Sequence, residues 1–178
     1  MTIFVSMLRG INVSGQKRIS MDSLRATYSS LGFKNVETYV QSGNVVFEDS
    51  AGDPISAGAR IEKEIKRIFG FGVLVFIRTQ SELEKLVKNT PFKQKDESKL
   101  HVTFLSEKPA KIPLPQLNEA RRGEEEFLIS GREIYLFCPN GYGATKLSNS
   151  FFEKKLLVSA TTRNWRTVNA LLSLSSKE

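Results

Sequence analysis

The chain contains only one cysteine and one histidine among its 178 residues. A single cysteine, Cys138, excludes an internal disulfide and a cysteine-rich zinc site. With His101 as the only histidine, little remains for a metal centre, although a magnesium ion held by oxygen ligands stays open. We therefore expect no cofactor and no metal, and the scarcity of cysteine favours a reducing, cytoplasmic setting.

Long hydrophobic runs are also absent. No stretch approaches the roughly 20 apolar residues that a membrane-spanning helix requires. The N-terminus has no basic lead, and Arg9 interrupts the first apolar stretch too early for a signal peptide. We expect a soluble cytoplasmic protein with no membrane partner.

Acidic residues are scarce relative to basic ones. The 26 Lys and Arg side chains exceed the 19 Asp and Glu side chains and give a net charge of +7. Such an excess favours anionic partners, namely nucleotides, nucleic acid or acidic proteins. Because the charge is spread over both halves of the chain, a solvated basic surface with no binding role explains it equally well.

Residues 2–78 alternate strand and helix patterns in an order that predicts a fold. The order is strand, helix, strand, strand, helix, strand, and the two middle strands form a hairpin around Ser42-Gly43. The elements fall at residues 3–8, 21–31, 36–41, 44–48, 55–69 and 73–77. This is the split βαβ, ferredoxin-like arrangement.

The second half is an altered repeat of the first. Its predicted helices fall at residues 81–88, 116–121, 146–157 and 164–174, and its strands at 101–105, 126–130 and 133–138. We therefore predict an α+β protein with two ferredoxin-like (split βαβ) domains in tandem. They would span residues 1–78 and 79–178, have antiparallel sheets with helices on one face, and the second would carry additional C-terminal helices.

The predicted topology is shared by RNA-recognition domains. Residues 3–8 have the apolar-aromatic-apolar pattern of the first-strand signature in those domains. The central-strand signature needs aromatic rings on which bases stack, but Ser42 and Asn44 stand at two of these positions and only Phe47 is retained. We therefore do not expect base stacking on the sheet, and we expect Phe4 to pack against the second half.

Two predicted helix starts could bind an anion through free backbone N–H groups and the helix dipole. The first is the glycine loop at residues 140–146, where Thr145 would cap a helix beside Lys146. Its glycines do not have the spacing of a phosphate-binding P-loop. An ordinary turn and helix cap explains the same residues.

The second predicted helix start lies at residues 161–167. Thr161 or Thr162 would cap the last helix, and Arg163 and Asn164 would add polar groups beside it. Binding and structural bracing both remain open for Arg163 and Asn164.

Catalytic groups are poorly supported by the sequence. Cys138 follows an apolar strand and precedes Pro139, which favours a buried and inert thiol. His101 has no carboxylate or cysteine partner that the sequence makes visible. Whether the protein is an enzyme therefore stays open, and no catalytic residue is assigned.

Three motifs in order suggest a family. LRGINV at residues 8–13, YVQSGNVVF at 39–47 and ATTRNWRTV at 160–168 together resemble an uncharacterised bacterial family of unknown function. The resemblance spans nearly the whole chain, with Ser14-Gly15 where members often have a glycine pair. It implies two tandem ferredoxin-like domains with exchanged or shared C-terminal helices, and it supplies no catalytic residues.

Polar side chains in or beside the glycine turns of these motifs are unusual for a core. We hypothesise that they form a network at the junction of the two halves, which either braces the halves or holds a small anion. The proposed ligand-binding residues are Arg9, Asn12, Gln41, Ser42, Asn44, Lys146, Arg163 and Asn164. In a ferredoxin-like unit, the end of the first strand and the middle hairpin need not adjoin.

The functional hypothesis follows from this set of residues. We favour a non-catalytic binding protein for a small anionic ligand or nucleotide. The alternatives are a nucleic-acid-binding protein that uses its general positive charge, an enzyme acting on a phosphorylated metabolite, and a structural or partner-binding protein. The sequence leaves the oligomeric state open.

Overall fold

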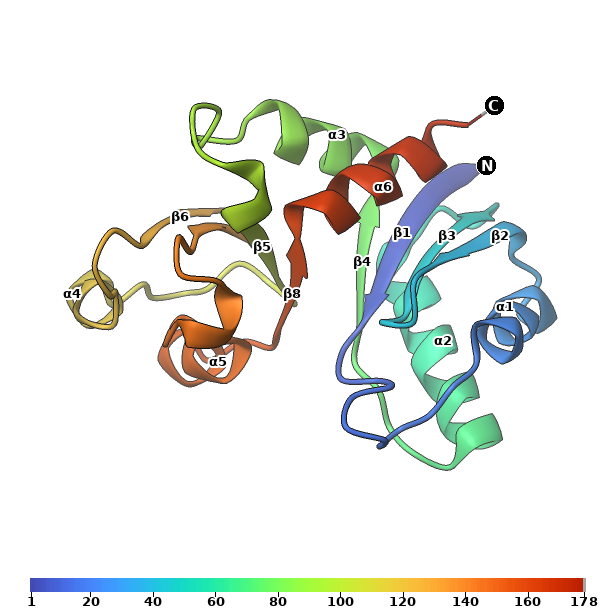
Figure 1. Ribbon diagram of the computed structural model, residues 1–178. Helices are drawn as coiled ribbons and strands as arrows, with labels where there is room; N and C mark the ends of the chain where they lie inside the picture. The colour runs from blue at the N-terminus through green and yellow to red at the C-terminus, as the bar shows by residue number, and fades with distance from the viewer. Residues whose placement is uncertain (178) are drawn as a thin grey trace. The chain divides into compact units, whose positions relative to one another are not determined.

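The computed structural model describes residues 1–177 and contains two successive βαββαβ repeats, each followed by one further helix (Figure 1). The first repeat comprises β1 (Thr2–Leu8), α1 (Met21–Ser30), β2 (Lys34–Tyr39), β3 (Asn44–Asp49), α2 (Pro54–Phe69), β4 (Val75–Thr79) and α3 (Gln80–Lys88). The second comprises β5 (Leu100–Leu105), α4 (Leu114–Glu119), β6 (Glu126–Ser130), β7 (Glu133–Phe137), α5 (Asn149–Leu156), β8 (Ala160–Asn164) and α6 (Trp165–Ser175).

Each repeat forms its own four-stranded antiparallel sheet. The strand order is β2-β3-β1-β4 in the first sheet and β6-β7-β5-β8 in the second. Both sheets therefore place the first strand of the repeat between the third and the fourth, which is the ferredoxin-like order. The prediction of an α+β protein with two tandem ferredoxin-like domains is confirmed.

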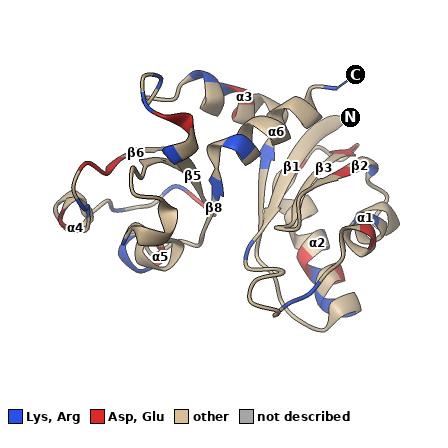
Figure 2. Cartoon of the chain, viewed as in Figure 1, with Lys and Arg blue, Asp and Glu red and all other residues tan. Residues whose placement is uncertain are grey.

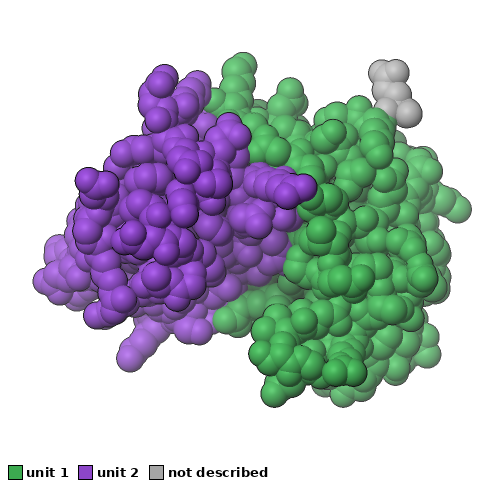
Figure 3. Space-filling view, viewed as in Figure 1, with its two compact units in different colours: residues 1–88, 169–178 green, residues 89–168 purple. Residues whose placement is uncertain are grey.

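The chain divides into two compact units (Figure 3). The first contains residues 1–88 and 169–178, and the second contains residues 89–168. The sequence placed the boundary after residue 78, whereas in the structure α3 also belongs to the first unit. The C-terminal helix α6 begins in the second unit and ends in the first.

The first core lies between the sheet and the helices α1 and α2 (Figure 1). Phe4 and Phe47 are fully buried there, with ring centroids 5.6 Å apart, and Phe33 lies 4.5 Å from Phe47. Ser6, two residues after Phe4 on β1, shares a 2.8 Å hydrogen bond with the buried hydroxyl of Tyr28. The prediction that Phe4 packs against the second half is therefore wrong, because β1 turns Phe4 and Ser6 toward the helices of its own unit.

The opposite face of the first sheet is also covered. Val5, Met7 and Phe76, which alternate with the helix-facing residues, are buried. Within the same unit, α3 packs against β1 and β4. The side chains of Val5, Met7 and Phe76 are therefore not open to solvent on this face.

The second core forms in the same way between the second sheet and the helices α4 and α5. Cys138 lies in this core, and its predicted burial is confirmed. Burial raises the pKa of the Cys138 thiol to about 11, so the thiol stays protonated and unreactive near neutral pH.

Two predicted helix starts in the second unit are corrected. Helix α5 begins at Asn149 rather than near Lys146, because Ser148 and not Thr145 accepts the N–H of Phe151 and caps it. Residues 160–164 form the strand β8, which pairs with β5. The last helix therefore begins only after β8.

The two repeats share a hydrogen bond between a glutamate and the backbone at the edge strands β4 and β8. Glu62 on α2 accepts the N–H of Val75 at 2.9 Å through Oε1, and Glu153 on α5 accepts the N–H of Ala160 at the same distance. In both repeats, a carboxylate from the second helix thus binds the first N–H of the fourth strand. Such partners occupy edge groups that could otherwise pair with another chain.

The fourth strand of each repeat also carries a buried arginine that bonds to its own backbone. Arg78 Nη1 donates to the carbonyl of Ile77 at 2.9 Å, and Arg163 Nη1 donates to the carbonyl of Thr162 at 3.0 Å. Both arginines occupy the fourth position of their strand. The repeats therefore correspond residue by residue along these strands.

His101 at the start of β5 gives the protein a pH-dependent stability. Its ring stacks on Tyr142 with centroids 4.9 Å apart, and its buried Nδ1 has no hydrogen-bond partner within residues 1–177. Burial lowers the pKa of His101 below its usual value. The unfolded chain therefore takes up a proton at a pH where the folded chain does not, and acidification favours unfolding.

We expect the free energy of unfolding to fall when the pH is lowered from about 7.5 to about 5.5, across the usual histidine range. His101→Phe keeps the stacking on Tyr142 and should lose less stability over that interval. Urea denaturation of both proteins at the two pH values tests this, and equal losses would contradict it.

None of the helices within residues 1–177 is long and apolar enough to cross a membrane. Across the same residues, no three His, Cys, Asp or Glu side chains gather closely enough to hold a metal ion.

Candidate functional site

The first two sequence motifs meet at one end of the first sheet. Because β1 and β3 are antiparallel neighbours, the end of β1 lies beside the start of β3, and Met7 pairs with Asn44. The N–H of Leu8 donates to the carbonyl of Gly43 at 2.9 Å. The end of the first strand and the middle hairpin therefore adjoin, which the antiparallel order alone could have indicated.

Gly43 allows this close approach. Its φ is +76°, and a Cβ at this position would lie 2.6 Å from Ile11 Cδ1 and 2.9 Å from Leu8 Cβ. Real Cβ contacts are longer than this, so only glycine fits without a shift of the backbone. The β2–β3 hairpin is therefore seated directly on the end of β1.

Asn12 holds the loop between β1 and α1 in place. Its Nδ2 donates to the carbonyls of Ile19 at 2.9 Å and Gln41 at 2.8 Å, and its Oδ1 accepts the N–H of Ile19 at 2.9 Å. These bonds use both ends of the carboxamide. Asn12 therefore braces the loop, and Gln41 takes part through its backbone.

Asn44 braces the hairpin on the other side. It is fully buried and donates to the carbonyl of Tyr39 at 3.0 Å and to Ser42 Oγ at 2.8 Å. The structure thus brings Asn12, Gln41, Ser42 and Asn44 together in the first unit. The hydrogen bonds described above lie within the loop and the hairpin and stabilise the motifs.

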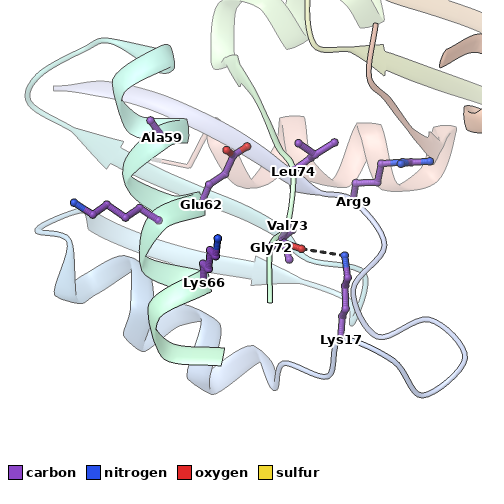
Figure 4. Close-up of a pocket in the computed structure, with 9 residues that line it drawn as sticks. Arg9, Lys17, Ala59, Glu62, Lys66, Gly72, Val73 and Leu74 are labelled. Atoms are coloured by element: carbon purple, nitrogen blue, oxygen red, sulfur yellow. Dashed lines mark hydrogen bonds between the residues drawn. The ribbon is translucent and has the colours of Figure 1, made fainter. Parts of the chain in front are cut away.

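The braced loop borders a cavity of about 560 Å³ between α2 and the segment before β4 (Figure 4). We call this cavity the basic groove. Its lining residues are Arg9, Lys17, Ala59, Glu62, Lys63, Lys66, Gly72, Val73 and Leu74. The lining thus combines four basic side chains, one carboxylate and a small apolar floor.

The lysines of the basic groove come from two separate elements. Lys17 extends from the loop and donates from Nζ to the carbonyl of Gly72 at 2.9 Å, as Figure 4 shows. Lys63 and Lys66 lie on one face of α2, are exposed, and form no hydrogen bond or ion pair within residues 1–177. The guanidinium of Arg9 extends away from α2 in Figure 4, so Arg9 forms the rim.

The carboxylate of Glu62 in the groove is hydrogen-bonded to the backbone. Its Oε1 accepts the N–H of Val75 at 2.9 Å and so protects the edge of β4. Figure 2 shows basic residues along the β1–α1 loop and both basic and acidic residues along α2, so the basic side chains of the groove outnumber its one carboxylate but lie beside its negative charge.

Of the basic residues in the groove, Arg9 could be proposed as a binding residue from the sequence, whereas Lys17, Lys63 and Lys66 were not among the predicted site residues. Lys63 and Lys66 lie on the exposed face of the second helix, where charged residues are ordinarily expected. The available signal was a pair of lysines three residues apart on a helix, together with Lys17 in the glycine loop. Their convergence depends on how α2 packs beside residues 72–74, which no local pattern reveals.

Residues 1–135 match the family described as "Protein of unknown function (DUF1697)". The chain belongs to this family. The matched residues include every part of the basic groove but end before Lys146, Arg163 and Asn164.

The fold of this DUF1697 member is shared by a solved structure. "The structure of conserved bacterial protein SP0830 from Streptococcus pneumoniae" is similar with a TM-score of 0.74, and the match covers 98% of this chain and 99% of that chain. At 20% sequence identity the likeness concerns the fold alone. No curated protein matches the chain.

The second unit of the DUF1697 chain has the same scaffold with a different residue at the Arg9 position. The N–H of Arg9 donates to the carbonyl of Leu74 at 3.0 Å, and the N–H of Ser106 donates to the carbonyl of Ser159 at 2.9 Å. Ser106 therefore corresponds to Arg9, and its hydroxyl also accepts the N–H of Ser159 at 3.1 Å. The fold can be built with a small neutral side chain at the Arg9 position.

The remaining predicted site residues of the DUF1697 chain lie in the second unit. Lys146 is exposed before α5, and Asn164 Oδ1 accepts the N–H of Thr167 at 2.8 Å, which caps α6. Arg163 is buried and also donates to Thr161 Oγ1 at 2.9 Å. Burial lowers the pKa of Arg163 to about 10, so the guanidinium still carries its charge near neutral pH.

Proposed function

We propose that the first unit binds a small anionic ligand, of the size of a phosphate-bearing metabolite or a nucleotide, in the basic groove. The observation that carries this proposal is the convergence of Lys17, Lys63 and Lys66, with Arg9 at the rim, around one cavity of about 560 Å³. Glu62, the carboxylate that lines the groove, is bound to a backbone N–H. Ligand sites in proteins commonly have volumes of about 300–1,000 Å³.

The scaffold does not require a basic side chain at every position of the groove, although Lys154 of the second unit stands where the first has Lys63. The second unit places Ser106 where the first has Arg9, and counting from the equivalent glutamates it places Leu157 where the first has Lys66. Like charges that converge on one cavity repel one another, and a bound anion relieves that repulsion. Lysine ammonium groups act as point charges that suit the oxygens of a phosphate.

Nucleic acid is the alternative partner that the positive charge suggests. Phe4 and Phe47 of the first sheet are fully buried in the core and are not available for stacking with bases. The salt dependence of binding separates the two cases. Contacts to many phosphates make affinity fall steeply with salt, whereas a small anion with few contacts gives a shallow slope.

We expect inorganic pyrophosphate, used as the probe, to bind the wild-type protein in isothermal titration calorimetry. The double variant Lys63→Ala/Lys66→Ala should weaken this binding at least about tenfold, equivalent to about 1.4 kcal/mol. Lys154→Ala/Lys155→Ala on α5 is the matched control, since it removes the same charge from the corresponding helix of the second unit. The control should bind as the wild type does, and equal weakening in both variants would contradict the assignment.

A further inference from the structure

The four sheet edges of the protein are not equally protected. The edges at β4 and β8 carry the glutamate and arginine contacts described above. The edge strand β2 is irregular, with a register shift between Lys34 and Glu37 and a φ of +49° at Asn35. β6, in contrast, pairs with β7 in an unbroken register over all five of its residues.

The free side of β6 presents a regular set of backbone groups. The hairpin to β7 has a two-residue turn, so Ser130 and Glu133 form its closing pair. Because hydrogen-bonded pairs alternate in an antiparallel ladder, Ser130, Leu128 and Glu126 bond to β7. Phe127 and Ile129 therefore direct their N–H and C=O groups away from β7. Within residues 1–177 these outward groups have no hydrogen-bond partner.

We propose that β6 pairs with β6 of a second copy of this chain, antiparallel about a two-fold axis that passes at Leu128. In this register Phe127 of one copy faces Ile129 of the other and exchanges two hydrogen bonds with it, and the symmetric pair does the same. All four outward groups of each chain are then satisfied, as a closed two-fold interface requires. This proposal does not depend on the basic groove.

Side chains support a second copy as the occupant. Leu128 is 46% exposed and would face Leu128 of the other copy at a non-hydrogen-bonded position, where side chains lie closest. The same register places Glu126 opposite Ser130, so no like charges meet along the strand.

The charges beyond the strand ends are also complementary. Continuing the register brings Arg132, at the turn of one copy, toward Glu124 of the other. Glu124 is exposed and forms no ion pair within residues 1–177, whereas Glu126 is paired with Lys95 at 2.6 Å. An arginine that approaches Glu124 would therefore meet an available carboxylate.

Two five-residue strands bury less than the roughly 1,600 Å² of a standard interface. We therefore expect a weak dimer, which forms as the concentration rises and dissociates on dilution. Sedimentation velocity over a range of concentrations measures this equilibrium.

Leu128→Asp should weaken dimerisation at least tenfold, because it places two carboxylates opposite each other at the axis. Leu157→Asp is the control, since Leu157 is an exposed leucine of the same unit away from β6.

Charge reversal tests the register. Glu124→Arg alone and Arg132→Glu alone should each weaken dimerisation, since each homodimer then opposes like charges. An equimolar mixture of the two variants should dimerise again, because both contacts of the mixed dimer then join one arginine and one glutamate. A wild-type protein that stays monomeric at all concentrations, a dimer unaffected by Leu128→Asp, or a mixture that fails to dimerise would overturn the proposal.

Discussion

Replacing Gly43 with alanine is expected to destabilise the first unit by about 3 kcal/mol. The backbone at Gly43 has a φ of +76°, which costs a non-glycine residue about 1–2 kcal/mol. The added Cβ would also lie 2.6 Å from Ile11 Cδ1 and 2.9 Å from Leu8 Cβ. Relieving such overpacking costs typically about 1–3 kcal/mol, so the two penalties act together.

Gly32→Ala is the matched control for the Gly43 prediction. Gly32 lies in the same unit with a φ of +85°, but no atom lies within 4 Å of the position that its Cβ would occupy. The Gly32→Ala variant should lose only the stability that the positive φ costs an alanine, about 1 kcal/mol. Urea denaturation followed by circular dichroism measures both variants. Equal losses would show that the hairpin does not rest on the end of β1 as described.

Removal of the Asn12 carboxamide should also cost about 3 kcal/mol. Three hydrogen bonds to backbone groups of Ile19 and Gln41 would be lost, at about 1 kcal/mol each. Asn12→Gly is the sharper substitution, because Asn12 has a φ of +54° that glycine adopts without strain. The measured loss then contains the hydrogen bonds and the added chain entropy of glycine in the unfolded state, and a second Asn→Gly variant shares the latter contribution. Because the same loop carries Lys17, pyrophosphate binding should weaken as well.

Asn35→Gly provides the comparison for Asn12→Gly. Asn35 is an asparagine of the same unit with a φ of +49°, and its exposed side chain donates one 2.8 Å bond to Glu48 Oε1. An exposed bond of this kind contributes little, so this variant should lose less than about 1 kcal/mol and keep its pyrophosphate binding. If both asparagine variants behaved alike, Asn12 would not be the brace of the loop.

Much of the fold could be predicted because its elements carry strong local patterns. The helix α2 has an apolar face, an aspartate cap at Asp53 and a terminal Gly70, and its predicted end at Phe69 matches the structure. The strand β8 was missed because residues 160–164 are short and largely polar. They become a strand through pairing with β5, which is far away in the sequence, and the expected cap of the last helix moved from Thr161 or Thr162 to Asn164.

Less of the candidate site could be predicted, for a related reason. Glycines in and beside the first two motifs indicated turns, and Gly10, Gly15 and Gly43 have positive φ in the structure. The polar residues beside them were predicted either to brace the two halves or to hold an anion, and in the structure Asn12 and Asn44 donate to backbone carbonyls of their own unit. Burial and hydrogen bonding distinguish a brace from a ligand contact, and neither property is visible in a list of residue types.

The claim that the first unit, and not the second, carries an anion site is tested most directly by a titration of inorganic pyrophosphate followed by amide chemical shifts in two-dimensional NMR. We predict progressive shifts at Lys17, at residues 72–74 and along the lysine face of α2, with the equivalent positions around Ser106 and α5 unchanged. Shifts that appear equally around Ser106 and α5, or no shifts in the basic groove at saturating probe, would contradict the account.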